Sequence, residues 1–565
     1  MMQRWFFLLM ALGGAALTFA QEGAASSRED WLPLGSEEIR LPRRIENTTD
    51  YSSPVVSRHR RVGIKETAPI PSLGSPKIPV VLVQFSDLNF TVAEGDEAVK
   101  ESFQKYCNGT GVPGEMYRPP TGSWGSVSDY FIEQSDSLFQ PQFEVIGPIT
   151  LSKPHAFYGE DLFEEVEPEG GNGEEQEGEK EKKLKQKDWN IKAFYSEACQ
   201  LAIQNYDLDW SDFDNNHDGK VDFVFFIYAG SGQNEVDDSD LIWPKEGSST
   251  LTVEVDETTT ILFGAYGCAC ELFQGKEAGV GIMCHELSHG LGLPDLYDTG
   301  YVSFGMDLWD IMDYGCYQIS SRQPCGYSAY ERDFMGWRPL QRISKGECLS
   351  LTLEPIERGG VGYIVTNDGQ ASGDEYFILE NRQNIGFDTY LGCPSFPVAN
   401  KYGVCHGLLI THVDYLASAW SKNRVNTVAN HQRLTLVPAD GTLISSIPGF
   451  NEEFHLSLRG DIYPGSEEVT ELSSYDVFVG RFTQRISNIV EHEDGTVTLD
   501  INGGATSGPG DVDRDGLLNI SDVTQLVNII LGRSEDTWDN GDANADDKVD
   551  ISDVTTVVNR ILNKE

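Results

Sequence analysis

The hydrophobic positions in the N-terminal half of the chain alternate between strand-like and helix-like patterns. Residues 78–85 and 223–228 are nearly continuous apolar runs, which are typical of buried strands. Between them, residues 192–206 carry apolar side chains at helical spacing. Strands that alternate with helices predict an α/β arrangement of layers.

The pattern changes in the C-terminal half. From about residue 345 to residue 501, short alternating runs are separated by turn residues, which predicts a mainly β region. A stretch rich in Gly, Ser and Pro then indicates a linker, and a repetitive acidic segment follows it. The predicted parts are a signal peptide at 1–20, a propeptide or leader at 21–72, an α/β domain at 73–340 with an insertion at 159–188, a mainly β domain at 341–502, a linker at 503–509 and a small helical module at 510–565.

The first 20 residues have the features of an export signal. Arg4 precedes a short apolar stretch, and Thr18-Phe19-Ala20 places small residues before a cleavage point at Gln21. The stretch is too short to span a bilayer comfortably, so no transmembrane span is expected. Residues 21–72 are polar and contain two Arg-Arg pairs, which favours a propeptide, with a disordered leader as the alternative. We therefore expect a secreted protein, extracellular or associated with the cell surface.

The composition of the chain bears on its partners, on its surface and on the state of its cysteines. The formal net charge of -47 disfavours nucleic acid, which needs a basic face, and favours carboxylate-rich cation sites. The insertion at 159–188 is rich in Glu, Lys and Gly, which predicts a mobile surface segment. Ten cysteines lie between Cys107 and Cys405, and they can either pair after export or stay as buried thiols.

A motif in the middle of the chain predicts a metal site. His285, Glu286 and His289 form the string His-Glu-x-x-His, and residues four apart lie on one face of a helix. Two imidazoles so placed can bind a tetrahedral Zn²⁺, and Glu286 can act as the general base that activates metal-bound water. The alternative is a pair of solvent-facing histidines on an ordinary helix.

The residues after the motif favour the zinc site. Gly292 permits a tight turn, and Asp295 follows at the spacing of a third ligand in the extended zinc-peptidase motif. Asp298 is the rival for this role, and spacing alone favours Asp295.

A second motif lies downstream, at Trp309-Asp310-Ile311-Met312-Asp313-Tyr314. It resembles the Met-turn of metzincins, in which a methionine forms an apolar floor beneath the zinc ligands. Met312 is therefore expected to have a structural role, with an ordinary core methionine as the alternative. Tyr314 is a candidate for stabilising the oxyanion through its hydroxyl group.

Two acidic loops near the C-terminus repeat the ligand spacing of calcium sites. Oxygen ligands are expected at positions 1, 3, 5, 9 and 12, and position 7 contributes its backbone carbonyl. The ligands are Asp511, Asp513, Asp515, Leu517, Asn519 and Asp522 in the first loop, and Asp542, Asn544, Asp546, Lys548, Asp550 and Asp553 in the second. Apolar helices are expected to follow, at 523–531 and 554–562. The duplicated spacing closely resembles a type I dockerin.

A third loop has a shorter version of the same spacing. Asp214, Asn216, Asp218 and Asp222 match the first positions, but Phe225 occupies position 12. A calcium site and a turn rich in Asp and Asn before a strand are equally compatible with this pattern.

Together, the motifs between the leader and the linker resemble the immune inhibitor A family of secreted metallopeptidases. The resemblance rests on His-Glu-Leu-Ser-His-Gly-Leu-Gly-Leu-Pro-Asp-Leu-Tyr-Asp, on Trp-Asp-Ile-Met-Asp and on Asp-Gly-Lys-Val-Asp-Phe-Val-Phe-Phe-Ile-Tyr-Ala-Gly. It implies a metzincin-like catalytic domain, a propeptide and broad endopeptidase activity on proteins. The acidic insertion departs from the expected pattern of the family.

The leading hypothesis is thus a secreted zinc endopeptidase with zinc and calcium as cofactors and proteins or peptides as substrates. An adhesion or scaffold protein with a structural zinc is the main alternative, although a structural site would need four protein ligands and no base. Another type of zinc hydrolase, such as an amidase, would share the same core site. The dockerin-like module adds a cohesin-type partner or, more simply, a calcium-stabilised tail.

Overall fold

The computed structural model of the chain describes residues 68–563, apart from gaps of which 111–123 and 167–180 are the longest. The predicted signal peptide, most of the predicted propeptide and the calcium-loop residue Asp515 lie outside the described residues. Within the described residues, no helix combines the length and the apolar character that crossing a bilayer would require.

The N-terminal half is built on a seven-stranded sheet with the order β2-β1-β5-β8-β6, in which β7 and β9 also pair with β8. Strands β2, β1, β5 and β8 are parallel, whereas β6, β7 and β9 run antiparallel to β8. The strands are β1 (Lys77–Gln84), β2 (Gln142–Thr150), β5 (Val221–Ser231), β6 (Lys245–Gly247), β7 (Leu251–Glu254), β8 (Thr260–Phe273) and β9 (Lys276–Glu277). The two strands predicted from apolar runs are the central pair β1 and β5, which confirms both.

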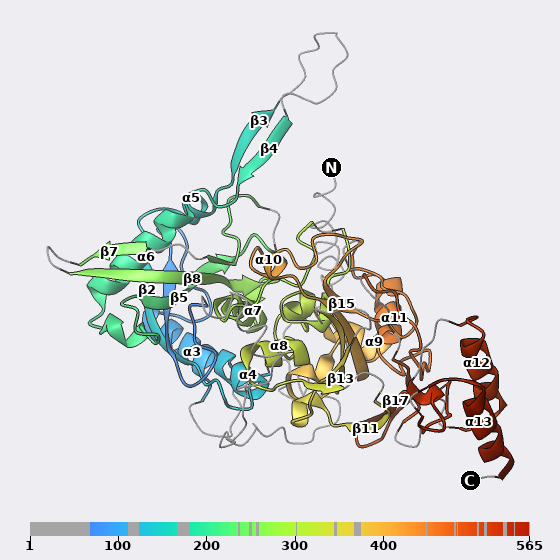
Figure 1. The fold of residues 1–565 in the computed structure, drawn as a ribbon. Coiled ribbons are helices and arrows are strands. Elements are labelled where there is room, and N and C mark those ends of the chain that lie inside the picture. The colour runs from blue at the N-terminus through green and yellow to red at the C-terminus, as the bar shows by residue number, and fades with distance from the viewer. Residues whose placement is uncertain are drawn as a thin grey trace, which may run out of the picture.

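Helices pack around this sheet (Figure 1). The predicted helix at 192–206 is α6, and its buried residues Phe194, Ala198 and Ala202 repeat every four positions, so they form one apolar face. Ser126 and Ser328 begin α4 and α8 with capping boxes. The helices of this half are α3 (Asp96–Asn108), α4 (Val127–Gln134), α5 (His155–Gly159), α6 (Ile191–Asn205), α7 (Gly281–Gly290) and α8 (Ala329–Met335).

The two ends of the acidic insertion form an antiparallel hairpin, β3 (Leu162–Val166) and β4 (Glu181–Gln186), which projects from the body of the protein (Figure 1). Asp188 anchors its base, because the buried carboxylate accepts a hydrogen bond from the Trp243 amide and pairs with Lys245 of β6. The composition of the insertion predicted a surface segment but not this hairpin. The Trp243 and Lys245 partners lie more than 50 residues away in sequence.

The C-terminal half contains a five-stranded sheet, β10-β12-β13-β14-β15, and a three-stranded sheet, β11-β17-β16. The strands are β10 (Gln341–Ile343), β11 (Leu349–Leu353), β12 (Tyr363–Thr366), β13 (Glu375–Arg382), β14 (Gly407–Asp414), β15 (Leu434–Leu436), β16 (Ile486–Glu491) and β17 (Val497–Ile501). The helices α9 (Phe396–Tyr402), α10 (Ala417–Trp420) and α11 (Glu452–Asp461) connect them. The region is mainly β, as the alternating runs indicated.

Strand β13 joins two hydrophobic cores because its side chains alternate between the faces of the sheet. Tyr376 and Ile378 belong to the core that also contains the N-terminal sheet, whereas Phe377 and Leu379 belong to a second core with β16 and β17. One continuous core therefore crosses the boundary that the sequence pattern placed at residue 341. The described chain as a whole has a mixed α/β fold.

The chain just before β1 packs against the helix that carries the His-Glu-x-x-His string. The Ile70 amide donates to the Gly290 carbonyl at 3.0 Å, and the Ile70 side chain is 2% exposed. Ser72 donates to the Met335 carbonyl and accepts from the Trp337 indole. The sequence pattern assigned these residues to the end of the leader, whereas their contacts favour a domain that begins at or before Ile70.

Replacing Ile70 with Ala is expected to lower the free energy of unfolding by about 2–4 kcal/mol, since a buried side chain is lost and a cavity remains. Urea unfolding measures the change. Leu73→Ala is the matched control, because Leu73 is 44% exposed and its loss should cost less than about 0.5 kcal/mol. Equal losses for the two variants would contradict the packing described for Ile70.

All ten cysteines are described, and none of them forms a disulfide. Nine are buried, and Cys348 is partly exposed. Burial raises the pKa of the thiols, for example to about 12 at Cys268 and Cys405. Such thiols are protonated at neutral pH and react slowly.

The C-terminal module consists of α12 (Ile520–Ile530) and α13 (Ile551–Asn563), which pack on each other. Val512, Leu526, Ala543 and Val557 form its small core. Both helices were predicted, and each begins about three residues earlier than the apolar pattern indicated, because the capping residues of the preceding loop start it.

Candidate metal centre

Glycines within α7 and just before it allow this helix to lie close to its neighbours. A Cβ atom at Gly279 would lie 2.1 Å from the Ser321 carbonyl oxygen, and one at Gly281 would lie 2.0 Å from the Cys316 carbonyl oxygen. At the other end, a Cβ atom at Gly290 would lie 2.8 Å from Ile70. Gly279 and Gly281 therefore allow the start of α7 to lie against the segment that follows the Met-turn, and Gly290 allows its end to lie against Ile70.

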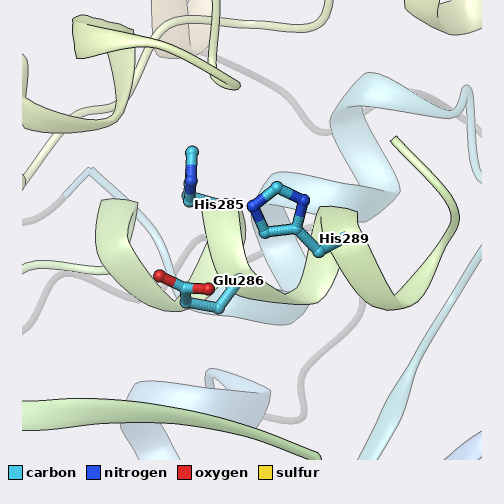
Figure 2. A group of neighbouring side chains, drawn as sticks. All are labelled: His285, Glu286 and His289. Atoms are coloured by element: carbon cyan, nitrogen blue, oxygen red, sulfur yellow. The ribbon is translucent and has the colours of Figure 1, made fainter. Parts of the chain in front are cut away.

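His285, Glu286 and His289 all lie on α7, and their ligand atoms are within 4.8 Å of one another. Figure 2 shows the two imidazoles on one side of the helix and the Glu286 carboxylate beside them. The ring centroids of the two histidines are 4.9 Å apart. The helical arrangement predicted from the four-residue spacing is thus confirmed.

Hydrogen bonds determine which nitrogen each histidine presents to the site. Nδ1 of His285 lies 2.8 Å from the Ile311 carbonyl oxygen, and Nδ1 of His289 lies 2.8 Å from the Leu293 carbonyl oxygen. A carbonyl only accepts, so each Nδ1 carries a proton, and each Nε2 is left to face the Asp295 side chain. Histidine ligands of metals are commonly oriented in this way.

Asp295 completes the cluster. Its Oδ1 lies 3.3 Å from Nε2 of His285 and 3.2 Å from Nε2 of His289, and this buried oxygen accepts no hydrogen bond. Neighbouring ligands of a tetrahedral zinc ion with bonds of about 2.0–2.1 Å are separated by roughly 3.3 Å. The donor set and its spacing therefore fit Zn²⁺.

The charges of the cluster also favour a bound cation. Burial lowers the pKa of His289, but the Asp295 carboxylate overrides this effect and raises the pKa to about 10 when no cation is present. Burial raises the pKa of Asp295, yet His289 and His285 hold it well below its usual range. The Asp295 carboxylate thus stabilises a positive charge beside the two histidines. A divalent cation can supply this charge while the imidazoles stay neutral.

Asp298, the rival ligand, has a different role. Its Oδ1 accepts a hydrogen bond from the Gly300 amide, and its Oδ2 accepts from the Val302 amide and the Ser303 hydroxyl. Both carboxylate oxygens are used to close the loop after the motif.

Asn423 orients Asp295 and was not found from the sequence. Its side-chain nitrogen donates to Asp295 Oδ2 at 2.5 Å, and its side-chain oxygen accepts from the Asp295 amide at 2.6 Å. Asn423 has φ of 53°, a left-handed conformation that asparagine tolerates better than most residues. This pair of bonds turns the remaining Asp295 oxygen toward the two histidines.

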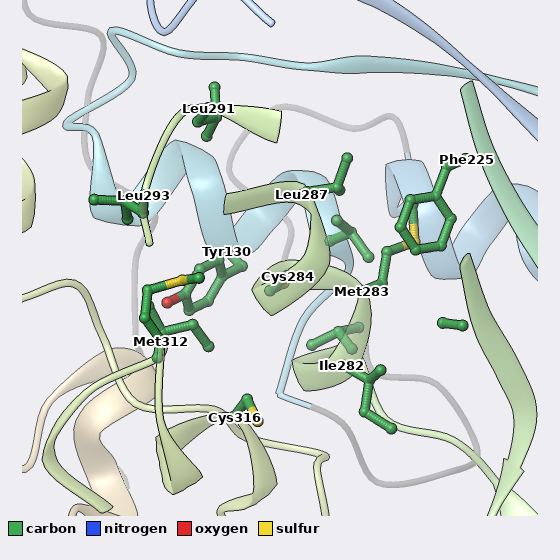
Figure 3. Packing of buried hydrophobic residues seen from close by; sticks show 14 of the residues in the cluster. Tyr130, Phe225, Ile282, Met283, Cys284, Leu287, Leu291, Leu293, Met312 and Cys316 are labelled. Atoms are coloured by element: carbon green, nitrogen blue, oxygen red, sulfur yellow. The ribbon is translucent and has the colours of Figure 1, made fainter. Parts of the chain in front are cut away.

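The segment of Met312 packs beside the candidate ligands. Met312 is fully buried on the side of α7 opposite Phe225 of β5 (Figure 3). Its carbonyl accepts from the Leu296 amide, next to Asp295, while the carbonyl of Ile311 accepts from His285. The turn therefore contacts segments that carry two of the three candidate ligands.

The two aspartates of the Met-turn motif fold this segment. Asp310 Oδ1 accepts from the Met312 amide at 2.8 Å, and Asp313 accepts from the amides of Met306, Asp307 and Tyr314. Buried backbone groups need such partners. The motif Trp-Asp-Ile-Met-Asp is thus explained by the hydrogen bonds that hold the turn.

Glu286 is buried, and burial raises its pKa to about 7, although His285 and His289 oppose the shift. A second carboxylate, Glu246 of β6, lies near the cluster, because α7 packs against β6. Burial raises the pKa of Glu246, with His289 opposing the shift and Asp295 adding to it. Glu246 belongs to no recognisable motif, so it could not be found from the sequence.

The structure also brings together parts of the three acidic loops. Oxygens of Asp511, Asp513 and Asp522 lie within 4.8 Å of one another, and so do oxygens of Asp214, Asp218 and Asp222. In the repeated loop, Asp553 accepts from the amides of Asn544 and Asp550, as Asp522 does from those of Val512 and Asn519. The remaining predicted ligands that are described, Leu517, Asp542, Asp546 and Lys548, lie in the same two loops.

Comparison with known proteins identifies two parts of the chain. Residues 70–339 match the family described as immune inhibitor A peptidase M6, catalytic domain. The chain contains an M6 peptidase domain. Residues 509–562 match the type I dockerin domain. The match to the M6 peptidase domain begins at Ile70, in agreement with the packing of that residue.

Two curated proteins are similar to part of this chain. Immune inhibitor A of Bacillus thuringiensis subsp. alesti is 25% identical over 282 residues, which cover 46% of this chain and 39% of that protein. Pre-pro-metalloprotease PrtV of Vibrio cholerae serotype O1 is 25% identical over 289 residues, which cover 46% of this chain and 29% of that protein. The chain therefore spans well under half the length of either relative.

Replacing Asn423 with Ala is expected to weaken zinc binding by the M6 peptidase domain by roughly 10–100-fold, as is typical for partners that orient a metal ligand. Competition with a zinc indicator measures the change. Asn384→Ala is a matched control, because the Asn384 side chain bonds only to backbone carbonyls outside the metal centre. Unchanged zinc affinity in Asn423→Ala would contradict the orienting role.

Proposed function

We propose that this chain is an exported zinc-dependent endopeptidase that hydrolyses peptide bonds in proteins. The observation that carries the proposal is the position of Asp295 Oδ1, which lies 3.2–3.3 Å from two imidazole nitrogens and accepts no hydrogen bond. Glu286 beside these ligands favours catalysis over a structural zinc, because a structural site is closed by four protein ligands.

The residues of the site have separate roles in hydrolysis. His285, His289 and Asp295 would hold the metal. Zinc, when bound, supplies a Lewis acid that polarises the scissile carbonyl and makes water easier to deprotonate near neutral pH. Glu286 takes a proton from the attacking water onto its carboxylate and delivers it to the leaving amine. Burial raises the pKa of Glu286, which helps the carboxylate to accept the proton from water.

Strand β6 offers a place for an extended substrate. It ends the order of the N-terminal sheet, and no described strand pairs with its outer edge. A peptide added there forms backbone hydrogen bonds that do not depend on sequence, which suits broad activity on proteins. An edge strand beside the metal helix, together with the Met-turn, supports a metzincin-like layout of the catalytic domain.

Tyr314 is proposed to stabilise the oxyanion. Asp313 holds its backbone, and its half-buried ring lies near Tyr317 and Phe450, so the side chain has a defined environment beside the Met-turn. Tyr314→Phe is expected to lower kcat by about 10²-fold, with KM and the melting temperature unchanged. Full turnover by this variant would remove the role, and Tyr317→Phe provides the matched control.

The experiment that tests the function is digestion of casein by the secreted protein, with and without a zinc chelator, followed by mass spectrometry of the products. Internal cleavage that stops in the chelator and returns with zinc is expected. Hydrolysis limited to side-chain or terminal amides would instead favour an amidase. Absence of any cleavage by zinc-loaded protein would favour the adhesion or scaffold alternative.

The dockerin domain is proposed to bind two calcium ions and a cohesin-type partner. The clustered carboxylates of the first loop support a calcium ion there. The hydrogen bonds of Asp553, which repeat those of Asp522, support a calcium ion in the second loop. Exposed apolar residues begin the two helices at equivalent positions, Ile520 and Ile551, which are 72% and 67% exposed. A pull-down of the full chain with immobilised cohesin domains, in calcium and in calcium-free buffer, tests the partner.

A further inference from the structure

The loop before β5 carries a buried carboxylate that the peptidase site does not use. Asp222 is 4% exposed, and its Oδ1 accepts no hydrogen bond. A buried, unpartnered carboxylate oxygen is costly unless a cation or a proton accompanies it. The nearest acidic neighbours are Asp214 and Asp218, whose oxygens lie within 4.8 Å of those of Asp222.

The backbone of this loop directs further oxygens to the same point. Asp214 accepts from the amides of Asp218 and Gly219, and Asn216 Oδ1 accepts from the Asp218 amide. Gly219 has φ of 87°, which only glycine adopts without strain, and it occupies position 6, where calcium loops make their sharp turn. The Lys220 carbonyl falls at position 7 of the same register.

We propose that this loop is a calcium site that belongs to the peptidase domain and is separate from the two dockerin loops. Its ligands are the side chains of Asp214, Asn216, Asp218 and Asp222 and the backbone carbonyl of Lys220. Three carboxylates among five oxygen donors favour Ca²⁺, and water completes its coordination of six to eight ligands. Asp222 at position 9 takes the place of the acidic residue that position 12 lacks.

The site joins the two central strands of the peptidase sheet. Asn215 donates to Asp222 Oδ2 through both its amide and its side chain. The same side chain exchanges two hydrogen bonds with Lys77, the first residue of β1, and Asp222 lies at the start of β5. Calcium bound to Asp222 therefore stabilises the point where β1 and β5 begin. Phe223, the next residue of β5, packs against Gly290 of α7.

Calcium stoichiometry of the full-length, zinc-loaded protein tests the proposal. Asp222→Asn keeps a side-chain oxygen for Asn215 but removes the charge, so it is expected to bind one calcium ion fewer per chain than the wild type. Asp212→Asn is the matched control, because Asp212 is an exposed neighbour that pairs with Lys77 and lies outside the cluster. Equal stoichiometry in the wild type and Asp222→Asn would overturn the proposal.

Hydrogen exchange of the wild-type chain decides the matter even if Asp222→Asn fails to fold. In buffer that contains zinc, adding calcium is expected to slow exchange in peptides that cover residues 214–222 by at least tenfold. Protection confined to residues 511–553 would mean that calcium binds only to the dockerin domain, and the proposal would be wrong.

Discussion

Replacing Glu286 with Gln is expected to lower kcat for peptide hydrolysis by roughly 10³-fold, because a general base contributes about 10²–10⁴-fold and the amide cannot accept the proton from water. The side chain keeps its shape, so zinc content and melting temperature should stay at wild-type values. Initial rates on a fluorogenic peptide, together with metal analysis, measure the effect.

Glu277→Gln is the matched control for this variant. Burial raises the pKa of Glu277 to about 7, as it does for Glu286, but Glu277 lies on β9 and is not part of the metal cluster. Its replacement should leave kcat within about twofold of wild type, since no proton transfer depends on it. If Glu286→Gln retained full activity with zinc bound, Glu286 would not be the base.

Replacing Asp295 with Ala is expected to abolish stoichiometric zinc binding and, with it, peptide hydrolysis. Two imidazoles would remain where a catalytic zinc site uses three protein ligands. Asp298→Ala should instead retain one zinc ion per chain. It loses three hydrogen bonds to a carboxylate that close the loop, so its free energy of unfolding should fall by about 2–4 kcal/mol.

Dialysed samples of the two variants, compared by metal analysis and by thermal unfolding, separate the two roles. If Asp298 is the third ligand instead, the two variants should show the opposite results. Loss of zinc in Asp298→Ala with retention in Asp295→Ala would make Asp298 the third ligand and would require the loop after α7 to rearrange.

The zinc-binding face could be predicted from the sequence because its geometry is local. The four-residue spacing of His285 and His289 determines their positions once a helix forms, and Gly292 adopts the φ of 100° that the tight turn requires. Both Asp295 and Asp298 follow the turn, and their different hydrogen bonds in the folded chain distinguish them.

The residues that support the site could not be predicted, because they are distant in sequence. Asn423 contacts Asp295 across 128 positions, and neither its residue type nor its surroundings form a motif. Glu246 lies on a strand of three residues, which is too short for a periodic pattern. Only the folded chain brings such residues to the metal centre.

For the fold, as for the site, features that depend on neighbouring residues could be predicted, whereas features that depend on residues distant in sequence could not. Strands β1 and β5 are apolar along their length because both faces of the parallel sheet are covered, so their sequence identified them. The short alternating runs of the C-terminal half also predicted strands in the region of β13, but they did not predict how its faces are buried. Both faces of this strand are buried, each in a different core, and that sharing depends on tertiary packing.

The most direct test of the central claim is a titration of metal-free protein with zinc while internal peptide-bond cleavage is followed. Activity is predicted to be absent at the start, to rise in proportion to added zinc and to saturate at one equivalent per chain. Full cleavage by the metal-free protein would contradict the claim. Activity that reaches its maximum without zinc bound to His285, His289 and Asp295 would contradict it as well.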